Sequence, residues 1–295
     1  MKKRVVIIGG SAAGISAAVA AAENSPACEV TILTSDRRPY RRPGITSLIN
    51  GGTQAGILTK KTASDLGISL ICGAKATEID TEAKLVNYTT GKKDSIHYDS
   101  LVIATGGVPV IPDIPGMNRY PACTFNSFEE ARQLNHQIAD AGSAVVIGGG
   151  FLALEAAEAL MQRGLDVSLN VRSRLLRKIA EPDISEYLQG RLQRRGLKIL
   201  QGESLSRLTG GDSLEYAEFR GGRIPVSIVV AAAGIKANSV LASAAGIDTG
   251  ISEAIRVDHR MESSVKDVYA AGDCAESPDY FSGKNVYSPL AGTAA

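Results

Sequence analysis

One arrangement of residues occurs twice in this chain of 295 residues and restricts its fold more than any other feature. The segment "KRVVIIGGSAAGISAAVAAAE" contains an apolar run, a glycine turn and an alanine-rich helical pattern, and "CEVTILTSD" follows it as a second apolar run. The same order returns in "SAVVIGGGFLALEAAEALMQRG" and "DVSLNV". A strand, tight turn, helix and strand within about thirty residues form a βαβ unit with parallel strands. Two copies predict an α/β fold with two Rossmann-like dinucleotide-binding domains.

The segments outside these units predict a mixture of parallel sheets and antiparallel meanders. After an Arg- and Pro-rich loop, "TKKTASDLG" predicts a helix, and the alternating segments "ISLICG", "KATEIDTEAKLVNYT" and "SIHY" indicate antiparallel strands. "YDSLVIATGG" and "VKDVYAAGDCAE" each predict a strand that ends in a small-residue turn, and "PDISEYLQGRLQRRG" predicts a helix. Turn-rich segments at 115–122 and 234–239 flank the second unit. We therefore expect one domain from residues 1–115 and 236–295 and another from residues 116–235.

The composition excludes several classes of function. A formal net charge of +1 gives no overall field that would attract nucleic acid or an anionic membrane, and the apolar runs are too short and too rich in Ala and Gly to span a bilayer. The basic start is followed at once by a strand and glycines, unlike a secretory signal, so a cytoplasmic location is expected. The four cysteines form no C-x-x-C pair, and the three histidines lie in unrelated segments. We expect neither a metal site nor a dithiol centre.

The first glycine turn, "IIGGSAAG", follows the G-x-G-x-x-G pattern at Gly9, Ser11 and Gly14, with serine in the middle position. Such a turn brings the backbone N–H groups at a helix start close to a pyrophosphate, where the helix dipole favours negative charge. Asp36 ends the second strand about 20 residues beyond Gly14, where an acidic residue binds a ribose hydroxyl. A tight strand-to-helix turn without a ligand is the alternative for this motif considered alone.

The second turn, "VIGGGFLALE", has Gly148 and Gly150 at the first two positions and Ala153 at the third. The third position sets how closely the helix packs on the strand, so a methyl group changes that spacing slightly. Glu155 lies further along the helix, where we expect the nicotinamide end of a bound cofactor. Two such turns, each at the correct distance from a second strand, indicate two bound dinucleotides.

Four motifs in a fixed order resemble those of a known family. They are "IIGGSAAG", "YDSLVIATGG", "VVIGGGFLALEAAEAL" and "VYAAGDCAE". Together they resemble the FAD-dependent pyridine nucleotide-disulphide oxidoreductase superfamily, and most closely its branch of NAD(P)H oxidases, rubredoxin reductases and the flavin part of nitrite reductases. The resemblance covers essentially the whole chain and implies a glutathione-reductase-type fold. In this fold an NAD(P)H domain is inserted into an FAD domain, and FAD takes a hydride from the nicotinamide.

The resemblance implies most of the cofactor-binding residues. The first turn would hold the FAD pyrophosphate with Arg42 nearby, and Asp36 or Ser35 would bind the adenosine ribose. Asp273 would bind ribityl or phosphate oxygens, and an N-cap for a following helix is the alternative. The set expected to bind FAD is Gly9, Gly10, Ser11, Ala12, Ala13, Gly14, Ser35, Asp36, Arg37, Arg42, Ala76, Ala104, Thr105, Gly106, Gly272, Asp273, Pro289 and Leu290. The set expected to bind the nicotinamide cofactor is Gly148, Gly150, Phe151, Leu152, Glu155, Arg172, Arg174, Arg177 and Gly234.

The stretch "VSLNVRSRLLRK" ends the second strand of the nicotinamide unit without the acidic residue that binds the ribose 2′-hydroxyl of NADH. Val171 removes the repulsion of a 2′-phosphate, and Arg172, Arg174 and Arg177 supply charge-assisted donors for it. Ala153 and the loop arginines also resemble NADPH-using glutathione reductases. We therefore predict NADPH as the preferred cofactor, with NADH possible. Arginines that only cover an exposed loop are the alternative.

Two positions depart from the family pattern. Where disulphide-reducing members and many oxidases have a cysteine facing the flavin, "YRRPGITSLI" has Pro43 and Gly44, and where ferredoxin-reductase-like members often have a lysine it has Ser47. Without that sulfur, disulphide reduction and cysteine-based peroxide chemistry lose support, and no side chain is predicted to be catalytic. Many members continue into a C-terminal interface domain, which is expected to be absent after Ala295, so the oligomeric state is left open.

The expected activity is that of an FAD-dependent NAD(P)H oxidoreductase. Its electron acceptor would be a small redox protein, such as a rubredoxin or ferredoxin, or a small molecule. Arg37, Arg38 and Arg41 are expected to form either a docking patch for an acidic carrier or a solvated charge run. An oxidase that reduces dioxygen and a nucleotide-binding subunit of a larger redox complex are the alternatives. We expect no nucleic-acid partner and no membrane partner.

Overall fold

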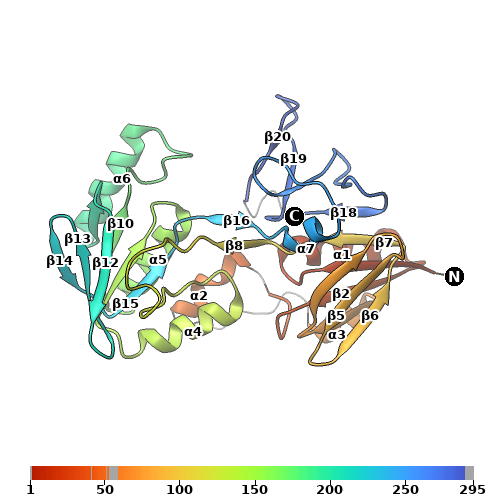
Figure 1. Cartoon of the computed structure of the whole chain (residues 1–295), viewed down its shortest axis with the longest axis horizontal. Coiled ribbons are helices and arrows are strands. Elements are labelled where there is room, and N and C mark those ends of the chain that lie inside the picture. The colour runs from red at the N-terminus through yellow and green to blue at the C-terminus, as the bar shows by residue number, and fades with distance from the viewer. Residues whose placement is uncertain (1, 41, 51, 53–58, 290–295) are drawn as a thin grey trace. The chain divides into compact units, whose positions relative to one another are not determined.

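The fold is that of a computed structural model, which describes residues 2–40, 42–50, 52 and 59–289. The α/β class, with parallel sheets and antiparallel meanders, is confirmed (Figure 1). The chain divides into two compact units. Unit 1 comprises the described residues of Met1–Pro43, Ala55–Val108 and Ile235–Ala295, and unit 2 those of Gly44–Gln54 and Pro109–Gly234. The short segment that begins at Gly44 lies in unit 2, whereas the sequence-based division placed it with residues 1–115.

A five-stranded parallel sheet forms the centre of unit 1. Its strands, in spatial order, are β18 (Val268–Ala270), β7 (Ser100–Ile103), β1 (Lys3–Ile8), β2 (Cys28–Thr34) and β3 (Ile68–Cys72). Helix α1 (Ala12–Asn24) connects β1 to β2 and packs on both strands. The buried face of α1 consists of Gly14, Ile15 and Ala18, so two of its three positions are small. Small residues let the helix lie close to the sheet, as this type of βαβ unit requires.

The pairing of β3 differs from the sequence expectation. The alternating segment "ISLICG" indicated an antiparallel strand, but β3 pairs in parallel with β2, and Thr34 lies opposite Cys72. The connection from β2 contains helix α3 (Lys60–Asp65), and a helical crossover of this kind returns the chain in the same direction. The antiparallel expectation is confirmed for the sheet of β4 (Lys75–Asp80), β5 (Leu85–Thr89) and β6 (Lys93–His97).

The remaining short elements lie in or next to unit 1. They are η1 (Arg42–Gly44), β8 (Gly107–Pro109), β16 (Ile235–Ala237), α7 (Val240–Ala244), β17 (Ile255–Arg256), β19 (Ala275–Pro278) and β20 (Asn285–Val286). Strand β8 pairs with β16, at the two points where the chain passes between the units. Strands β17, β19 and β20 form a small sheet of their own.

Unit 2 repeats the parallel arrangement of unit 1. Its central sheet consists, in spatial order, of β11 (Lys198–Gln201), β10 (Asp166–Val171), β9 (Ser143–Ile147) and β15 (Ile228–Ala231). Its longer helices are α4 (Phe128–Ile138), α5 (Phe151–Gln162) and α6 (Pro182–Arg194). The predicted meander is present as the antiparallel sheet of β12 (Leu205–Gly210), β13 (Leu214–Phe219) and β14 (Gly222–Pro225). Helix α5 connects β9 to β10 as α1 connects β1 to β2.

Helix α2 (Thr46–Ile49) is held in unit 2 by polar contacts. Arg163 Nη1 donates to the carbonyl oxygen of Ile49 at 2.8 Å and to Asn135 Oδ1 at 2.6 Å. Asn50 Nδ2 donates to Gln162 Oε1 at 2.8 Å, and the side chain of Ile49 is fully buried. These contacts explain why the segment after the Arg- and Pro-rich loop packs against α4 and α5.

The described residues lack two features, a helix that could cross a membrane and a cluster of metal-ligating side chains. None of the described helices is both long and apolar enough to cross a membrane, and α1 and α6 each have 13 residues. The described part of the chain also contains no group of three or more His, Cys, Asp or Glu side chains that could hold a metal ion.

Candidate dinucleotide-binding sites

Three predicted cofactor segments meet at one edge of the parallel sheet in unit 1. The last residues of β1, β7 and β18 lie side by side, since Ile8 pairs with Ile103 and Ile103 with Ala270. The ladder continues into the turns, where the amide of Ala104 donates to the carbonyl of Ile8 at 2.8 Å. The glycine turn, the Ala104–Gly106 turn and the Gly272–Asp273 turn therefore adjoin, although they are far apart in the sequence. Such an edge is where parallel α/β sheets bind ligands.

The glycines of the first turn are required by their neighbours. Gly9 has φ +125°, and a Cβ added to it would lie 2.1 Å from the carbonyl oxygen of Ala104. A Cβ on Gly10 would lie 2.7 Å from the Thr34 side chain, and a Cβ on Gly14 would lie 2.0 Å from the Gly9 carbonyl oxygen. Contacts this short exclude side chains at all three positions. The turn is therefore a place where backbone, strand and helix approach one another without side chains between them.

The N-terminus of α1 is open to an anion. Ala12 and Ala13 begin the helix, and Ser11 is its N-cap residue. Among the described residues, the Ser11 side chain accepts no capping hydrogen bond from the backbone N–H groups of the helix, and the first turn contains no acidic residue. Backbone N–H groups at such a terminus, together with the helix dipole, favour a negatively charged ligand. The first turn thus has the geometry and the charge preference for a pyrophosphate.

The end of β2 lies against the same turn. Tyr40 donates its amide hydrogen to the carbonyl of Gly10 at 3.2 Å, so the loop that contains Ser35 and Asp36 folds back over the glycines. The Asp36 amide donates to Thr34 Oγ1 at 3.3 Å, and the Gly73 amide donates to the Asp36 carbonyl at 3.0 Å. Sequence reasoning identified Asp36 and missed Thr34 and Tyr40. In the sequence, only their nearness to Asp36 could have indicated that they belong to this site.

The Ala104–Gly106 turn is fixed by Asn238. Thr105 Oγ1 donates to the Asn238 carbonyl at 2.6 Å, Asn238 Nδ2 donates to the Thr105 carbonyl at 3.3 Å, and the Asn238 amide donates to the Gly106 carbonyl at 2.9 Å. Gly106 itself has φ +71°. Gly107 is also constrained, because an added Cβ would lie 2.2 Å from Ile235 Cγ2. Sequence reasoning did not find Asn238, which is separated from this turn in the sequence by Pro109–Gly234 of unit 2.

Asp273 and Arg42 face each other in unit 1. Arg42 Nη1 lies 3.6 Å from Asp273 Oδ2, and the exposed fractions of the two side chains are 28% and 13%. Burial raises the pKa of Asp273, and the positive charge of Arg42 opposes this effect. Tyr287 donates its hydroxyl hydrogen to the Asp273 carbonyl at 3.1 Å, and its pKa is raised to about 12, mainly by burial and also by the Asp273 charge. Strand β19 follows Asp273, so the alternative of a helix N-cap is wrong.

We expect Asp273→Asn to stabilise the protein without FAD while weakening its binding of FAD. A raised pKa means that the fold favours the protonated carboxyl, so wild-type stability is lost as the pH rises from about 4 through the raised pKa. The wild-type apoprotein should therefore unfold at a lower temperature than the variant at neutral pH. Thermal unfolding of both apoproteins at a series of pH values measures this difference.

Asp99→Asn provides the control with opposite sign. The guanidinium of Arg4 lowers the pKa of Asp99 to about 2, so the wild type should lose stability relative to this variant as the pH falls through that value. Equal pH dependence of the two variants would contradict the assignment of Asp273 as a carboxyl whose ionisation is opposed by burial.

The remaining residues predicted to bind FAD are Arg37, Ala76, Pro289 and Leu290. Arg37 is exposed, and Pro289 is partly buried. Ala76 is partly buried in β4. Two residues before it, the amide of Ala74 donates to the carbonyl of Thr34 at 2.8 Å. Leu290 and Arg41 lie outside the described residues.

Unit 2 contains the same construction at the ends of β9, β10 and β15. Ile147 pairs with Asn170 and with Ala231, so the turns that follow these strands adjoin. Gly148 has φ +141°, and a Cβ added to it would lie 2.2 Å from the carbonyl oxygen of Ala232. A Cβ on Gly149 would lie 2.9 Å from Val171 Cγ1. These contacts correspond to those that Gly9 makes with Ala104 and Gly10 with Thr34.

The helix after the second turn is also open at its N-terminus. Gly150 is the N-cap residue of α5, and a Cβ added to it would meet no atom within 4 Å among the described residues. Phe151 is 55% exposed, Leu152 is partly buried and Glu155 is exposed. Ala153 is fully buried at the position that Gly14 has in α1. Gly234, with φ +136°, follows β15 at the same edge of the sheet.

The three loop arginines differ in their surroundings. The amide of Leu176 donates to the Gly149 carbonyl at 2.7 Å, just as Tyr40 donates to Gly10, so the loop after β10 lies beside the second turn. Arg172 and Arg177 are exposed. Arg174 instead donates from Nη1 to Ser185 Oγ at 2.8 Å and from Nη2 to the Arg177 carbonyl at 3.1 Å. Both terminal nitrogens of Arg174 are therefore engaged within the loop and α6, and these contacts do not support the prediction that Arg174 donates to a phosphate.

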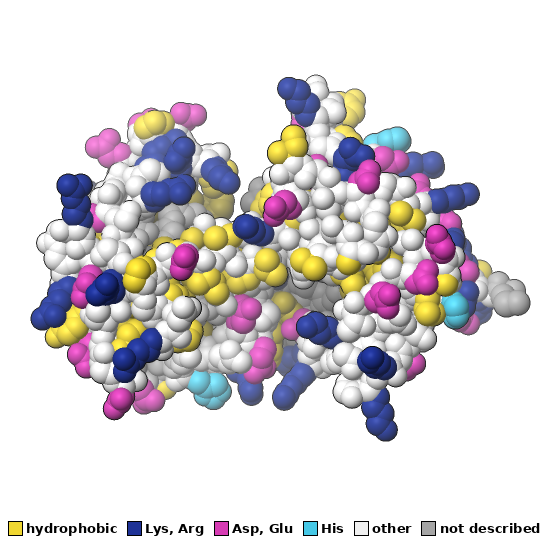
Figure 2. Space-filling view, in the orientation of Figure 1, with side chains coloured by type: hydrophobic (Ala, Val, Ile, Leu, Met, Phe, Trp, Pro, Cys, Tyr) yellow, Lys and Arg dark blue, Asp and Glu magenta, His cyan; other side chains and the backbone are white. Residues whose placement is uncertain are grey.

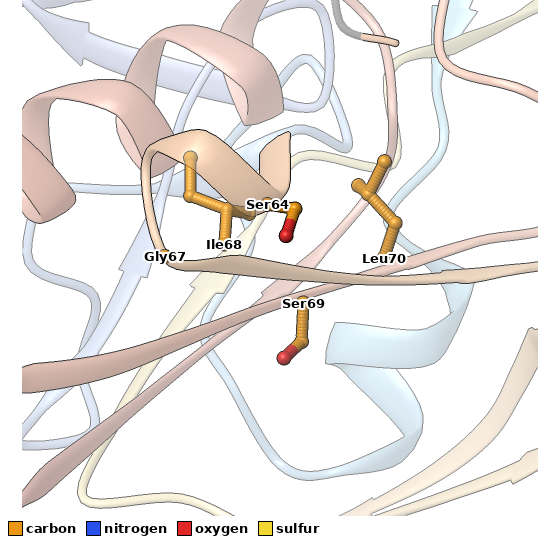
Figure 3. A pocket seen from close by; sticks show the side chains of 5 residues that line it. All are labelled: Ser64, Gly67, Ile68, Ser69 and Leu70. Atoms are coloured by element: carbon orange, nitrogen blue, oxygen red, sulfur yellow. The ribbon is translucent and has the colours of Figure 1, made fainter. Parts of the chain in front are cut away.

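One surface hollow in unit 1 lies at the start of β3, away from the first glycine turn. It measures about 440 Å³ and is lined by Ser64, Gly67, Ile68, Ser69 and Leu70, beside edge strand β3 (Figure 3). The lining offers two hydroxyl groups and no charged side chain. It has no cationic side chain and no glycine turn at a helix start, so the glycine turns are the better candidates for nucleotide binding.

A sequence model of the pyridine nucleotide-disulphide oxidoreductase family matches residues 3–288 of this chain. The chain belongs to this family. Among its relatives, a CoA-dependent NAD(P)H sulfur oxidoreductase of Pyrococcus furiosus is 34% identical, over 98% of this chain and 67% of that protein. The nitric oxide reductase FlRd-NAD(+) reductase of Escherichia coli is 31% identical, over 94% of this chain and 73% of that protein.

Solved structures of the family have the same fold. An NAD-dependent persulfide reductase from A. fulgidus has a TM-score of 0.91 and 30% identity, over 99% of this chain and 57% of that chain. An engineered water-forming NADPH oxidase bound to NADPH has a TM-score of 0.89 and 25% identity, over 99% of this chain and 67% of that chain. This chain therefore spans only part of the length of these relatives. Membership of the family makes it an FAD-dependent NAD(P)H oxidoreductase, as the four sequence motifs indicated.

Cysteine chemistry has little support in this member of the family. The sequence has Pro43 and Gly44 at the place where disulphide-reducing members of the family have a cysteine. Cys274, which follows Asp273, is fully buried, and its Sγ lies 3.3 Å from the carbonyl oxygens of Ile103 and Ala271. Burial raises the pKa of this thiol. A buried neutral thiol is a poor nucleophile, so Cys274 is suited to packing and not to disulphide exchange.

Proposed function

We propose that this protein is an NADPH-preferring flavoprotein reductase that passes electrons from NADPH through FAD to a small redox protein. The observation that carries the nucleotide preference is the end of β10, where Val171 and exposed Arg172 stand in place of an acidic residue. A carboxylate at this place would repel a 2′-phosphate, whereas a guanidinium donates charge-assisted hydrogen bonds to it.

The engineered NADPH oxidase supports this preference. Its five substitutions introduce alanine for glycine, alanine for aspartate, arginine for alanine, serine for methionine and arginine for proline. At the spacing of those five positions, this chain has Ala153, Val171, Arg172, Ser173 and Lys178. Each is the introduced residue itself or one of the same kind. The comparison also favours Lys178 over Arg177 as the second cation that would bind the phosphate.

The residues of unit 1 fit the binding of FAD. The glycine turn and the open N-terminus of α1 would bind the pyrophosphate through backbone N–H groups, and Asp36 would accept a hydrogen bond from the adenosine ribose. Asp273 would accept hydrogen bonds from hydroxyl groups of the ribityl chain, and the positive charge of Arg42 favours its ionised form against the effect of burial. When bound, FAD accepts a hydride from the nicotinamide and can release its electrons one at a time, so no side chain of this protein is required to form a bond with substrate.

A protein electron carrier is the acceptor that the site supports best. The sulfur oxidoreductase and the persulfide reductase among the relatives act on sulfur compounds according to their names. The Escherichia coli relative is named for reducing a flavorubredoxin. Pro43 and Gly44 replace the cysteine, and Cys274 is buried, so the reactive thiol that a sulfur substrate would require is not provided by these positions. Transfer of electrons to a carrier requires no thiol.

The acceptor is tested by reoxidation of the reduced flavin. The protein, loaded with FAD and reduced anaerobically by NADPH, is mixed with a rubredoxin, a ferredoxin, dioxygen or inorganic polysulfide at equal concentrations. We expect one of the two carrier proteins to reoxidise the flavin at least about tenfold faster than the other acceptors, since docked carriers reach effective concentrations that free small molecules do not. Fastest reoxidation by dioxygen would instead identify an oxidase, and fastest reoxidation by polysulfide a sulfur reductase.

A further inference from the structure

The loop after β10 is fixed by hydrogen bonds centred on Arg174 and Ser185, which we call the loop lock. Arg174 Nη1 donates to the carbonyl of Ala180 and, at 2.8 Å, to Ser185 Oγ. Arg174 Nη2 donates to the carbonyl of Arg177 at 3.1 Å. Ser185 in turn donates its hydroxyl hydrogen to the Leu175 carbonyl at 2.7 Å and is only 3% exposed, on the buried face of α6. The lock therefore ties this loop to a helix of unit 2.

The same loop is attached at its other side to the second glycine turn. The amide of Leu176 donates to the Gly149 carbonyl at 2.7 Å, and Leu176 has φ +49°, in the left-handed region. A leucine in this region costs about 1 kcal/mol or more, so the surrounding contacts must hold it there. The amides of Ile179 and Ala180 both donate to the Leu176 carbonyl at 2.9 Å. A loop with attachments on both sides keeps one conformation.

The charges of the loop make this restraint necessary. Four cations lie between residues 172 and 178, with no acidic residue among them. Figure 2 shows Lys and Arg side chains, together with Asp and Glu side chains, over the region of α6. Like charges this close repel one another unless an anion lies between them. A loop without its lock would therefore separate the cations before a ligand arrives.

We propose that Arg174 and Ser185 are positioning residues for NADPH. They hold the loop so that Arg172 and Lys178 present their charges toward one place, and they do not bind the 2′-phosphate themselves. This inference rests on the proposed NADPH site, and it assigns Arg174 a different role from Arg172 and Lys178 of the same loop. Holding the loop in advance lowers the entropy lost when the phosphate binds. NADH, which has no 2′-phosphate, gains little from the lock.

The conservative variant Arg174→Lys separates a ligand from a positioning residue. Lysine retains the positive charge but cannot donate to three acceptors from a planar fork. We expect both Arg174→Lys and Ser185→Ala to raise the KM for NADPH by about tenfold, the size expected for loss of one buried hydrogen bond to a charged group. We expect kcat, and the KM for NADH, to change by less than about twofold, because the bound phosphate is the only group that needs the lock.

Amide hydrogen exchange of the protein without nucleotide gives an independent measurement. The Leu176 and Ala180 amides should exchange at least about tenfold faster in both variants, because the conformation that protects them is no longer held. Arg172→Ala serves as the matched control, and it should raise the KM for NADPH without changing this exchange. The temperature of unfolding and the KM for NADH show whether either variant is damaged elsewhere.

The outcomes distinguish failure of the lock from failure of the site. If Arg172→Ala leaves the KM for NADPH unchanged, the proposed NADPH site is wrong. If Arg172→Ala raises it while Ser185→Ala and Arg174→Lys leave it unchanged, the positioning role is wrong and the site stands. If Arg174→Lys retains NADPH binding while Arg174→Ala loses it, Arg174 binds the phosphate by its charge, and the proposal is overturned.

Discussion

Gly9→Ala is expected to abolish FAD binding and to leave a colourless protein. Gly9 has φ +125°, which an alanine rarely adopts, and the added Cβ would lie 2.1 Å from the backbone oxygen of Ala104. That oxygen cannot move away easily, because the amide of Ala104 donates to the carbonyl of Ile8 at 2.8 Å. The turn must shift instead, and its N–H groups then no longer converge on one pyrophosphate. We expect the affinity for added FAD to fall by about 100-fold or more, corresponding to about 3 kcal/mol.

The matched control is Gly190→Ala, which makes the same substitution at a glycine within helix α6. A Cβ at Gly190 would meet nothing within 4 Å among the described residues, and its φ is not positive. This variant should bind FAD normally and gain up to about 1 kcal/mol of stability, because alanine favours the helix. Absorbance of the purified proteins and titration with FAD measure both effects. Normal FAD affinity in Gly9→Ala would contradict the assignment of this turn.

Arg172→Glu is expected to reverse the nucleotide preference. The glutamate would repel a 2′-phosphate and could accept a hydrogen bond from the 2′-hydroxyl of NADH, so both cofactors are affected in opposite directions. We expect kcat/KM for NADPH to fall by about 100-fold and kcat/KM for NADH to rise by up to about tenfold, because a charge is reversed at a position proposed to contact the 2′-phosphate. Steady-state rates with a dye acceptor measure both values.

Lys178→Ala and Arg177→Ala complete this series. If Lys178 is the second cation, its replacement raises the KM for NADPH by about tenfold, the contribution of one charge-assisted hydrogen bond. Arg177→Ala retains the backbone carbonyl that Arg174 binds, and it should have the smaller effect. A larger effect of Arg177→Ala would indicate that Arg177, and not Lys178, binds the 2′-phosphate, as the sequence first suggested. A wild-type preference for NADPH that survives in Arg172→Glu would contradict the assignment of Arg172.

Much of the fold could be predicted because local patterns decide it. The two glycine turns have the spacing of βαβ units, and both units are present with the expected parallel strands. The direction of β3 was predicted wrongly, since alternation of apolar residues does not reveal how an edge strand is connected. Helix α2 was not assigned to unit 2, because its contacts with Arg163 and Gln162 join segments more than a hundred residues apart.

The site residues were found where a motif contains them and missed where only tertiary structure brings them close. Gly9 and Gly148 belong to recognisable turns, whereas Asn238 fixes the Ala104–Gly106 turn from a distant segment. Arg174 is an example of the opposite error, in which the sequence suggested a role that the contacts of the side chain do not support. Its position among other arginines predicted a phosphate ligand, but the geometry of the loop directs its guanidinium to backbone carbonyls and to Ser185. Residue type and spacing do not determine where a long side chain points.

The most direct test of this account is anaerobic reduction of the FAD-loaded protein by NADPH and by NADH, followed in a stopped-flow spectrometer. The loss of flavin absorbance reports hydride transfer without any assumption about the acceptor. The account predicts that NADPH bleaches the flavin with a second-order rate constant at least about tenfold larger than that of NADH, as expected for one favourable charged contact. Faster bleaching by NADH, or no bleaching by either nucleotide, would contradict it.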